Sequence, residues 1–152
     1  MNKQKLVLNQ LDKKLAPFKQ ARQVIVPSKG WLHSILTSLN ITLRQLSDKL
    51  QTSPQNIKAV EEREASGAIT LKGLREVADA MDMQLVYAIV PKDDSIEELI
   101  KRRAGALARE IVLRTSASMK LEDQENSSAR LEQAINEKTL ELINDLPKYL
   151  WD

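Results

Sequence analysis

Four side chains between residues 54 and 58 have the chemistry needed to read the edges of DNA bases. Gln55 and Asn56 each carry an amide that donates and accepts hydrogen bonds together, as an adenine edge requires. Lys58 can reach a guanine or a phosphate, and Pro54 can pack on a thymine methyl group. Helical spacing turns these residues away from the apolar face, so we expect base contacts from Pro54, Gln55, Asn56 and Lys58.

Four further residues have the chemistry for phosphate contacts. Thr42 and Ser53 stand where two helices are expected to begin, and the free N–H groups of a helix N-terminus bind phosphate. Arg44 and Arg63 bring positive charge close to them. We expect these four residues to contact the DNA backbone.

Residue types that other chemistries require are missing or badly spaced. The chain has no cysteine and a single histidine, His33, which excludes thiolate metal sites and histidine clusters. The carboxylate pairs Glu61-Glu62 and Glu97-Glu98 are adjacent, so on a helix their members point in different directions and form no acid–base site. No phosphate-binding loop, nucleophile elbow or metal spacing is present. We expect no cofactor, no metal and no enzymatic activity, and we assign no role to His33.

Two short helices must hold the candidate DNA-contacting residues, and residues 42–61 have the pattern of a helix-turn-helix. Ser47 is small enough for a close helix crossing, and Ser53 is a good N-cap for the second helix. Gln51 stands where this turn usually has glycine, which requires either a positive φ or a slightly different turn. The inward positions recur at helical spacing: Leu43, Leu46, Leu50, Ile57, Val60 and Glu61.

The remaining pattern predicts a mainly α protein. Residues 3–23 read as a basic amphipathic helix interrupted near Pro17, and residues 28–40 as a helix with Trp31, Leu32, Ile35, Leu36 and Leu39 on its apolar face. Residues 64–69 read as a loop, after which Thr70 caps a helix whose inward residues are Leu71, Leu74, Val77, Ala78 and Met81. Ser95 and Glu98 form a capping box for a helix to about Ser116. A polar segment, residues 117–128, precedes a last helix over residues 128–144.

Residues 83–90 differ, because β-branched and aromatic side chains concentrate there and Pro91 follows. We expect one β-strand. A lone strand leaves its backbone unpaired, so it must pair either with residues 24–26 or with its copy in a second subunit.

Charge is distributed unevenly along the 152 residues, although the net charge is only +2. Residues 1–26 carry +5 and residues 121–152 carry −5, which suits a nucleic-acid contact at one end or a solvated helix surface at both. No apolar run approaches the roughly 20 residues of a membrane span, and the polar start is unlike a signal peptide, so we expect a cytoplasmic protein. We divide the chain into a basic arm (1–26), a DNA-binding domain (27–91) and a C-terminal helical segment for dimerisation or partner binding (92–152).

Several short stretches together resemble the family called mobile mystery protein A. They are Gly30-Trp31, Thr42 to Leu46, Ser53 to Asn56, Gly67 to Leu71, Leu85 to Pro91 and the closing Leu150-Trp151-Asp152, and they span most of the chain. Its central part is similar to the Cro/repressor-type (XRE) helix-turn-helix class. That resemblance implies a lambda-repressor-like five-helix domain that binds operators as a dimer.

The family resemblance also implies a gene on mobile elements beside a partner with a Fic domain, and so an antitoxin-like regulator. Fic inhibitors of the known type have Ser or Thr, three residues, then Glu followed by Gly or Asn. The one Glu-Asn pair here, Glu125-Asn126, has Leu121 at the first position, so the chain departs from that motif.

Taken together, the sequence predicts a dimeric, sequence-specific repressor or autoregulator of transcription that binds a near-palindromic site in double-stranded DNA. The alternative is an antitoxin-like protein that neutralises a Fic-domain partner, with the acidic tail and residues 149–151 as docking surface. Both can hold together, and a tetramer remains open beside the dimer.

Overall fold

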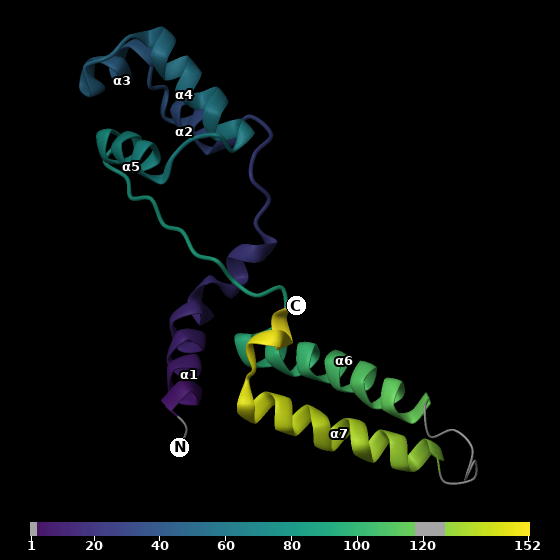
Figure 1. The fold of residues 1–152 in the computed structure, drawn as a ribbon. Coiled ribbons are helices and arrows are strands. Elements are labelled where there is room, and N and C mark those ends of the chain that lie inside the picture. Colours follow the sequence, from purple (N-terminus) through teal and green to yellow (C-terminus); the bar gives the residue numbers. More distant parts are fainter. Residues whose placement is uncertain (1–2, 118–126) are drawn as a thin grey trace. The chain divides into compact units, whose positions relative to one another are not determined.

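The computed structural model describes residues 3–117 and 127–152, and the chain forms two compact units, residues 1–22 with 89–152 and residues 23–88 (Figure 1). Every regular element in the described part is a helix, so the prediction of a mainly α protein is confirmed. None of these helices combines the length and the apolar character that crossing a membrane requires. The expectations for residues 118–126, including the motif departure at Leu121, lie outside the described residues.

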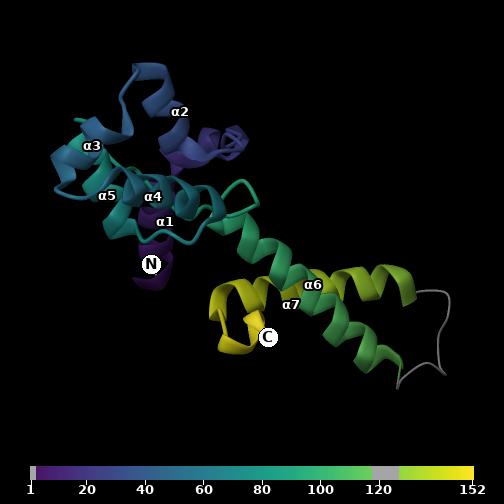
Figure 2. The same ribbon diagram turned by 90° about the horizontal axis from the view of Figure 1, so that it is seen from above.

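The unit of residues 23–88 gathers four helices around one apolar core: α2 (Gly30–Leu39), α3 (Leu43–Leu50), α4 (Pro54–Ser66) and α5 (Leu71–Ala80) (Figures 1 and 2). The core consists of Leu32, Leu36, Leu46, Ile57, Val77 and Met81. Three residues expected to face inward do not, since Trp31, Leu39 and Leu71 are 44%, 52% and 45% exposed. These residues lie beside the buried face of their helices, so helical spacing alone overestimated their burial.

Helix α4 is longer than expected, because it continues through Glu64 and ends at Ser66. Gly67 then adopts a left-handed conformation with φ of 83°, and its N–H bonds back to the carbonyl groups of Arg63 and Glu64. Glycine accepts this conformation without the steric cost that other residues meet. The loop predicted over residues 64–69 is therefore reduced to the residues after Ser66.

The prediction of a β-strand that pairs within the chain is wrong, because the described residues contain no strand. Residues 83–90 have no regular structure, and no hydrogen bond to another described group involves the backbone of residues 84–90. Residues 24–26, the partner considered within the chain, are likewise irregular. The β-branched side chains favour an extended backbone, but a strand also needs a second backbone beside it, and residues 3–117 and 127–152 supply none.

The other unit contains α1 (Lys3–Leu15), a 3₁₀ turn η1 (Ala16–Gln23) that begins in it, α6 (Ile96–Ala117), α7 (Ser127–Asp145) and η2 (Lys148–Trp151). The interruption near Pro17 is confirmed, because α1 ends at Leu15. Helices α6 and α7 lie side by side (Figure 1), and Ala104 and Ala108, both fully buried on α6, permit that close packing. The core is Ile100, Ala104, Ala108, Ile135, Leu142 and Leu150.

Helix α1 belongs to this unit through two contacts that its basic surface did not suggest. Leu8 packs on the core, and the Asp12 carboxylate accepts hydrogen bonds from the N–H groups of Ile96 and Glu97 at 2.7 and 3.2 Å. Asp12 thus caps α6 from another helix, where its negative charge also meets the positive end of the helix dipole. Of the predicted capping box, the Glu98 N–H bonds to Ser95 Oγ at 3.1 Å, whereas the Glu98 carboxylate accepts from Lys101.

Hydrogen bonds from two arginines hold the segment that leads into α6. Arg22 Nη1 donates to the carbonyl groups of Pro91, Lys92 and Asp93 at 2.9, 2.8 and 3.1 Å. Asp93 in turn accepts two hydrogen bonds from Arg102, at 2.8 and 3.1 Å. These hydrogen bonds, with the positive charge of Arg102, lower the pKa of the Asp93 carboxyl below its ordinary value.

Candidate nucleic-acid interface

The first helix of the predicted motif begins with a complete capping box. The Gln45 N–H donates to Thr42 Oγ1 at 3.0 Å, and the Thr42 N–H donates to Gln45 Oε1 at 2.9 Å. Two backbone N–H groups that a helix start leaves unpaired are thereby satisfied. The start of α3 is consequently well defined. Thr42 is its N-cap, and Arg44 is exposed within its first turn.

A three-residue turn joins α3 to α4. Gln51 has the positive φ that the sequence predicted as one possibility, with φ of 55° and ψ of 47°. The Thr52 N–H then bonds to the Ser47 carbonyl at 2.9 Å, and Ser53 Oγ accepts the Asn56 N–H at 3.1 Å as the predicted N-cap of α4. Pro54 occupies the first helical position, where its missing N–H leaves no hydrogen bond unmade.

The crossing of α3 and α4 is tightly packed. Leu46, Ser47 and Ile57 are each 1% exposed, and the Ser47 hydroxyl donates to the Arg44 carbonyl at 2.8 Å, so its polar atom is satisfied within α3. A larger residue at position 47 would push the two helices apart. Burial of these three residues fixes α4 on α3 and determines which of its faces is turned outward.

The residues predicted to contact bases lie in the first half of α4 with their side chains accessible. Gln55, Asn56 and Lys58 are exposed, and Pro54 is half-buried. Asn56 Nδ2 donates to Thr52 Oγ1 at 2.7 Å, which orients its amide, while Lys58 Nζ lies 4.0 Å from Glu61 Oε2. Gln55, Asn56 and Lys58 therefore form one polar surface, with Asn56 already held by a neighbour.

The residues predicted to contact phosphate are not all brought together. Thr42 and Ser53 act as helix caps through their Oγ lone pairs, which leaves each hydroxyl hydrogen available as a donor. Arg63 is exposed and lines, with Asn56, Thr52 and Thr70, a groove of about 430 Å³ between α4 and α5. Arg44 is exposed on α3 and does not line that groove.

A buried carboxylate lies on the inner face of α4, as the helical spacing predicted. Glu61 is only 7% exposed, and its Oε2 is 3.7 Å from His33 Nδ1 of α2 as well as 4.0 Å from Lys58 Nζ. His33 thus has a place opposite Glu61 that the sequence did not reveal, because the crossing of α2 and α4 is a tertiary feature. Lys58 keeps 57% of its side chain exposed at this distance, so its ammonium group remains accessible.

A second acidic residue of α4 was missed altogether. Glu64 Oε1 accepts the Leu32 N–H at 2.8 Å and so caps the start of α2. Gly30 has φ of 88°, and a Cβ added to it would lie 2.7 Å from the same Glu64 oxygen. Only a glycine permits this approach without displacing the carboxylate. The one signal in the sequence was a glycine in the first turn of an apolar helix, which did not identify its partner.

No family model, curated protein or solved structure matches this chain. Within residues 3–117 and 127–152, no group of three or more His, Asp or Glu side chains could hold a metal ion.

Proposed function

We propose that this chain is a transcriptional regulator that binds a specific double-stranded DNA site by a Cro-type, lambda-repressor-like helix-turn-helix, with α4 in the major groove. The observation that carries the proposal is the division of α4 into two faces. Ile57 and Glu61 are buried against α2 and α3, while Gln55, Asn56 and Lys58 are exposed at the end nearest the turn. A recognition helix needs both properties, because one face fixes its orientation and the other reads the bases.

Amide and ammonium groups in this position can discriminate between base pairs. Gln55 and Asn56 can each bond bidentately to adenine, and Lys58 can donate to guanine O6 and N7. Thr42, Arg44, Ser53 and Arg63 would contact phosphates and set the register of α4 on the duplex. The lysines of α1 would add attraction to the backbone that carries no sequence information and weakens with salt.

Regulators of this kind bind as symmetric dimers, and we include a dimer in the proposal. A two-fold axis predicts a near-palindromic site with half-sites one helical turn apart, roughly 34 Å. The protein would repress its own or neighbouring genes from the cytoplasm.

The test is an anisotropy titration of the full chain against its own upstream DNA and a scrambled duplex of equal length, each at two salt concentrations. Preferential binding that survives moderate salt supports the proposal, whereas equal and salt-sensitive binding to both duplexes refutes it. Gln55→Ala is expected to weaken specific binding by about 1–3 kcal/mol and to relax base preference. Gln133→Ala, which changes an exposed glutamine of α7, is the matched control and is expected to leave affinity unchanged.

A second candidate, binding of a protein partner of the antitoxin type, is supported by the C-terminal aromatic residues. Tyr149 and Trp151 are 52% and 49% exposed, while Leu150 between them is buried at 1%. Arg103 Nη2 donates to the carbonyl groups of Leu150 and Asp152 at 2.8 and 3.0 Å, so the pair is presented on a fixed backbone. Because Leu150 belongs to the core, a truncation before α7 would unfold this unit.

The double substitution Tyr149→Ala and Trp151→Ala tests partner binding instead. A co-encoded Fic-domain protein is the ligand, and the substitution is expected to leave DNA binding intact.

A further inference from the structure

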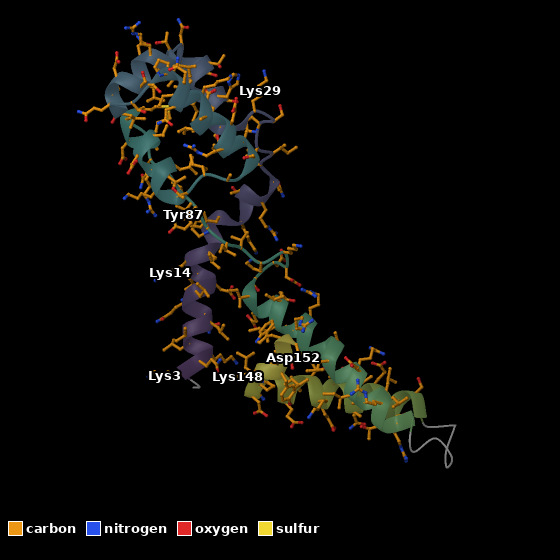
Figure 3. The ribbon with its side chains drawn as sticks, turned by 45° about the horizontal axis from the view of Figure 1, so that its top comes forward. Lys3, Lys14, Lys29, Tyr87, Lys148 and Asp152 are labelled. Atoms are coloured by element: carbon orange, nitrogen blue, oxygen red, sulfur yellow. The ribbon has the colours of Figure 1, made fainter. Side chains whose placement is uncertain are left out.

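The segment from Gln84 to Val90 has an unusual combination of properties for a chain surrounded by water. Val86, Tyr87 and Ile89 are 63%, 56% and 89% exposed, and no described group bonds to the backbone of residues 84–90 (Figure 3 labels Tyr87). Seven consecutive residues thus offer free N–H and C=O groups together with β-branched and aromatic side chains. This is the composition of a strand that lacks a neighbour.

The flanking contacts hold the segment at both ends and leave its middle free. At the start, the Met83 N–H bonds to the Ala78 carbonyl at 2.8 Å. At the end, Arg22 binds the carbonyl groups of Pro91 and Lys92. In the middle of the segment, Arg75 of α5 contacts the side chain of Tyr87 and leaves the backbone free. Its Nη2 lies 3.4 Å from the hydroxyl, and its guanidinium lies 5.6 Å from the ring centre.

We propose that residues 84–90 pair as an antiparallel strand with the same segment of a second copy of this chain, on a two-fold axis at Tyr87. The proposal rests on the proposed function only in that a symmetric dimer is expected there. The described chain contains no strand to which this segment could add, so its partner strand must come from another molecule. Antiparallel self-pairing gives both copies the same contacts and closes after two subunits.

The charges at the two ends of the segment fit this register. No charged residue occurs from Met83 to Pro91, and the first charges on either side are Asp82 and Lys92, both exposed. With Tyr87 opposite Tyr87, antiparallel pairing puts Asp82 of each copy opposite Lys92 of the other. Within the strand, Leu85 then faces Ile89 and Val86 faces Ala88. Opposite charges and apolar pairs across strands both stabilise a sheet.

Disulfide trapping tests the register directly, because the chain has no cysteine of its own. Residues directly opposite in an antiparallel pair have Cα atoms about 4.5–5.5 Å apart, within the range that a disulfide spans. Tyr87→Cys is therefore expected to give a disulfide-linked dimer under mild oxidation. The control is Ile25→Cys in the other extended segment, where Ile25 is as exposed as Ile89, at 89%.

Two further cysteine variants distinguish this register from its neighbours. Leu85→Cys and Ile89→Cys are each expected to stay monomeric alone, since like positions would be about 13 Å apart along the strands. Mixed together, they are expected to form a heterodimer. If Tyr87→Cys links no faster than Ile25→Cys, the segment does not pair and the proposal is overturned. If Tyr87→Cys instead links to Ile25→Cys when the two are mixed, the segment pairs with residues 24–26 and the proposal is likewise overturned.

Sedimentation equilibrium without cysteines provides the second test. Ile89→Lys is expected to raise the dimer dissociation constant at least tenfold, whereas Ile25→Lys is expected to leave it within twofold. Both side chains are exposed in the single chain, so circular dichroism should report an unchanged fold for both. A dimer that tolerates Ile89→Lys would overturn the proposal.

These measurements use protein alone, so they separate the two hypotheses. Trapping at Tyr87 without specific DNA binding would retain the strand pairing and refute the regulator. Specific DNA binding without trapping would support the regulator and refute the strand pairing.

Discussion

Substitution of Gly30 by alanine tests the packing of α2 on α4 in energetic terms. Alanine at φ of 88° is strained by about 1–2 kcal/mol. Its Cβ would also lie 2.7 Å from Glu64 Oε1 and displace that carboxylate from the Leu32 N–H. Because the hydrogen bond is charge-assisted but only partly buried, we take its loss as about 1.5 kcal/mol. Gly30→Ala is expected to destabilise the unit of residues 23–88 by about 3 kcal/mol.

Gly67→Ala is the matched control for backbone strain. Gly67 has φ of 83°, but a Cβ there would meet no atom within 4 Å. We therefore expect a loss of only about 1–2 kcal/mol from this substitution. The difference between the two glycines isolates the Glu64 contact.

A double-mutant cycle of Gly30→Ala and Glu64→Ala tests whether both substitutions remove the same hydrogen bond. Glu64→Ala alone is expected to cost about 1.5 kcal/mol, and the double variant with Gly30→Ala about 3 kcal/mol, since the same hydrogen bond is lost only once. Urea unfolding gives these values, followed by Trp31 fluorescence in a Trp151→Phe background so that one tryptophan reports. Additive losses near about 4.5 kcal/mol, or a Gly30→Ala chain no less stable than Gly67→Ala, would refute the reasoning.

Two further predictions concern the other unit. Asp12→Ala removes the cap of α6 and is expected to destabilise this unit by about 1–2 kcal/mol, with faster hydrogen exchange at the Ile96 and Glu97 amides; unchanged exchange would contradict the cap. Arg102→Gln is expected to raise the pKa of Asp93 toward its ordinary value of 3.8, as followed by NMR titration of the carboxyl group. Because that pKa is lowered in the folded chain, the interaction stabilises the protein above the unfolded pKa and is lost as pH falls through the folded value, so the variant should differ from the wild type least at the acidic end. An Asp93 pKa that does not move would show that Arg102 is not its cause.

Local signals in the sequence were sufficient for the helices of the candidate site. Ser53 and Thr70 are N-caps as predicted, and Thr42 lies at the helix start where the sequence placed it, because a cap depends on residues three positions apart in the chain. Gln51 takes the positive φ that was one of the two possibilities the sequence left open for this turn. The burial of Ile57 and Glu61 followed from helical spacing alone.

Contacts between distant segments could not be read in this way. Asp12 caps a helix more than eighty positions away, and Glu64 caps α2 from α4, yet nothing near either residue marks it as a cap. The prediction of a strand within one chain failed although its local pattern was clear. Residues 83–90 have the side chains of a strand, but strand formation depends on a second backbone that a local pattern does not specify.

The hydrogen bond between Asn56 and Thr52 has a consequence for the entropy of recognition. An exposed side chain that must become ordered on binding loses roughly 0.5–1.5 kcal/mol of conformational freedom. Asn56 is already oriented at 2.7 Å from Thr52 Oγ1, whereas its exposed neighbour Gln55 has no such partner among the described residues. With one amide hydrogen engaged, Asn56 offers its Oδ1 oxygen and its remaining N–H to any ligand in a fixed direction. Two adjacent amides of similar chemistry therefore differ in adaptability, and Asn56 should be the more selective of the two.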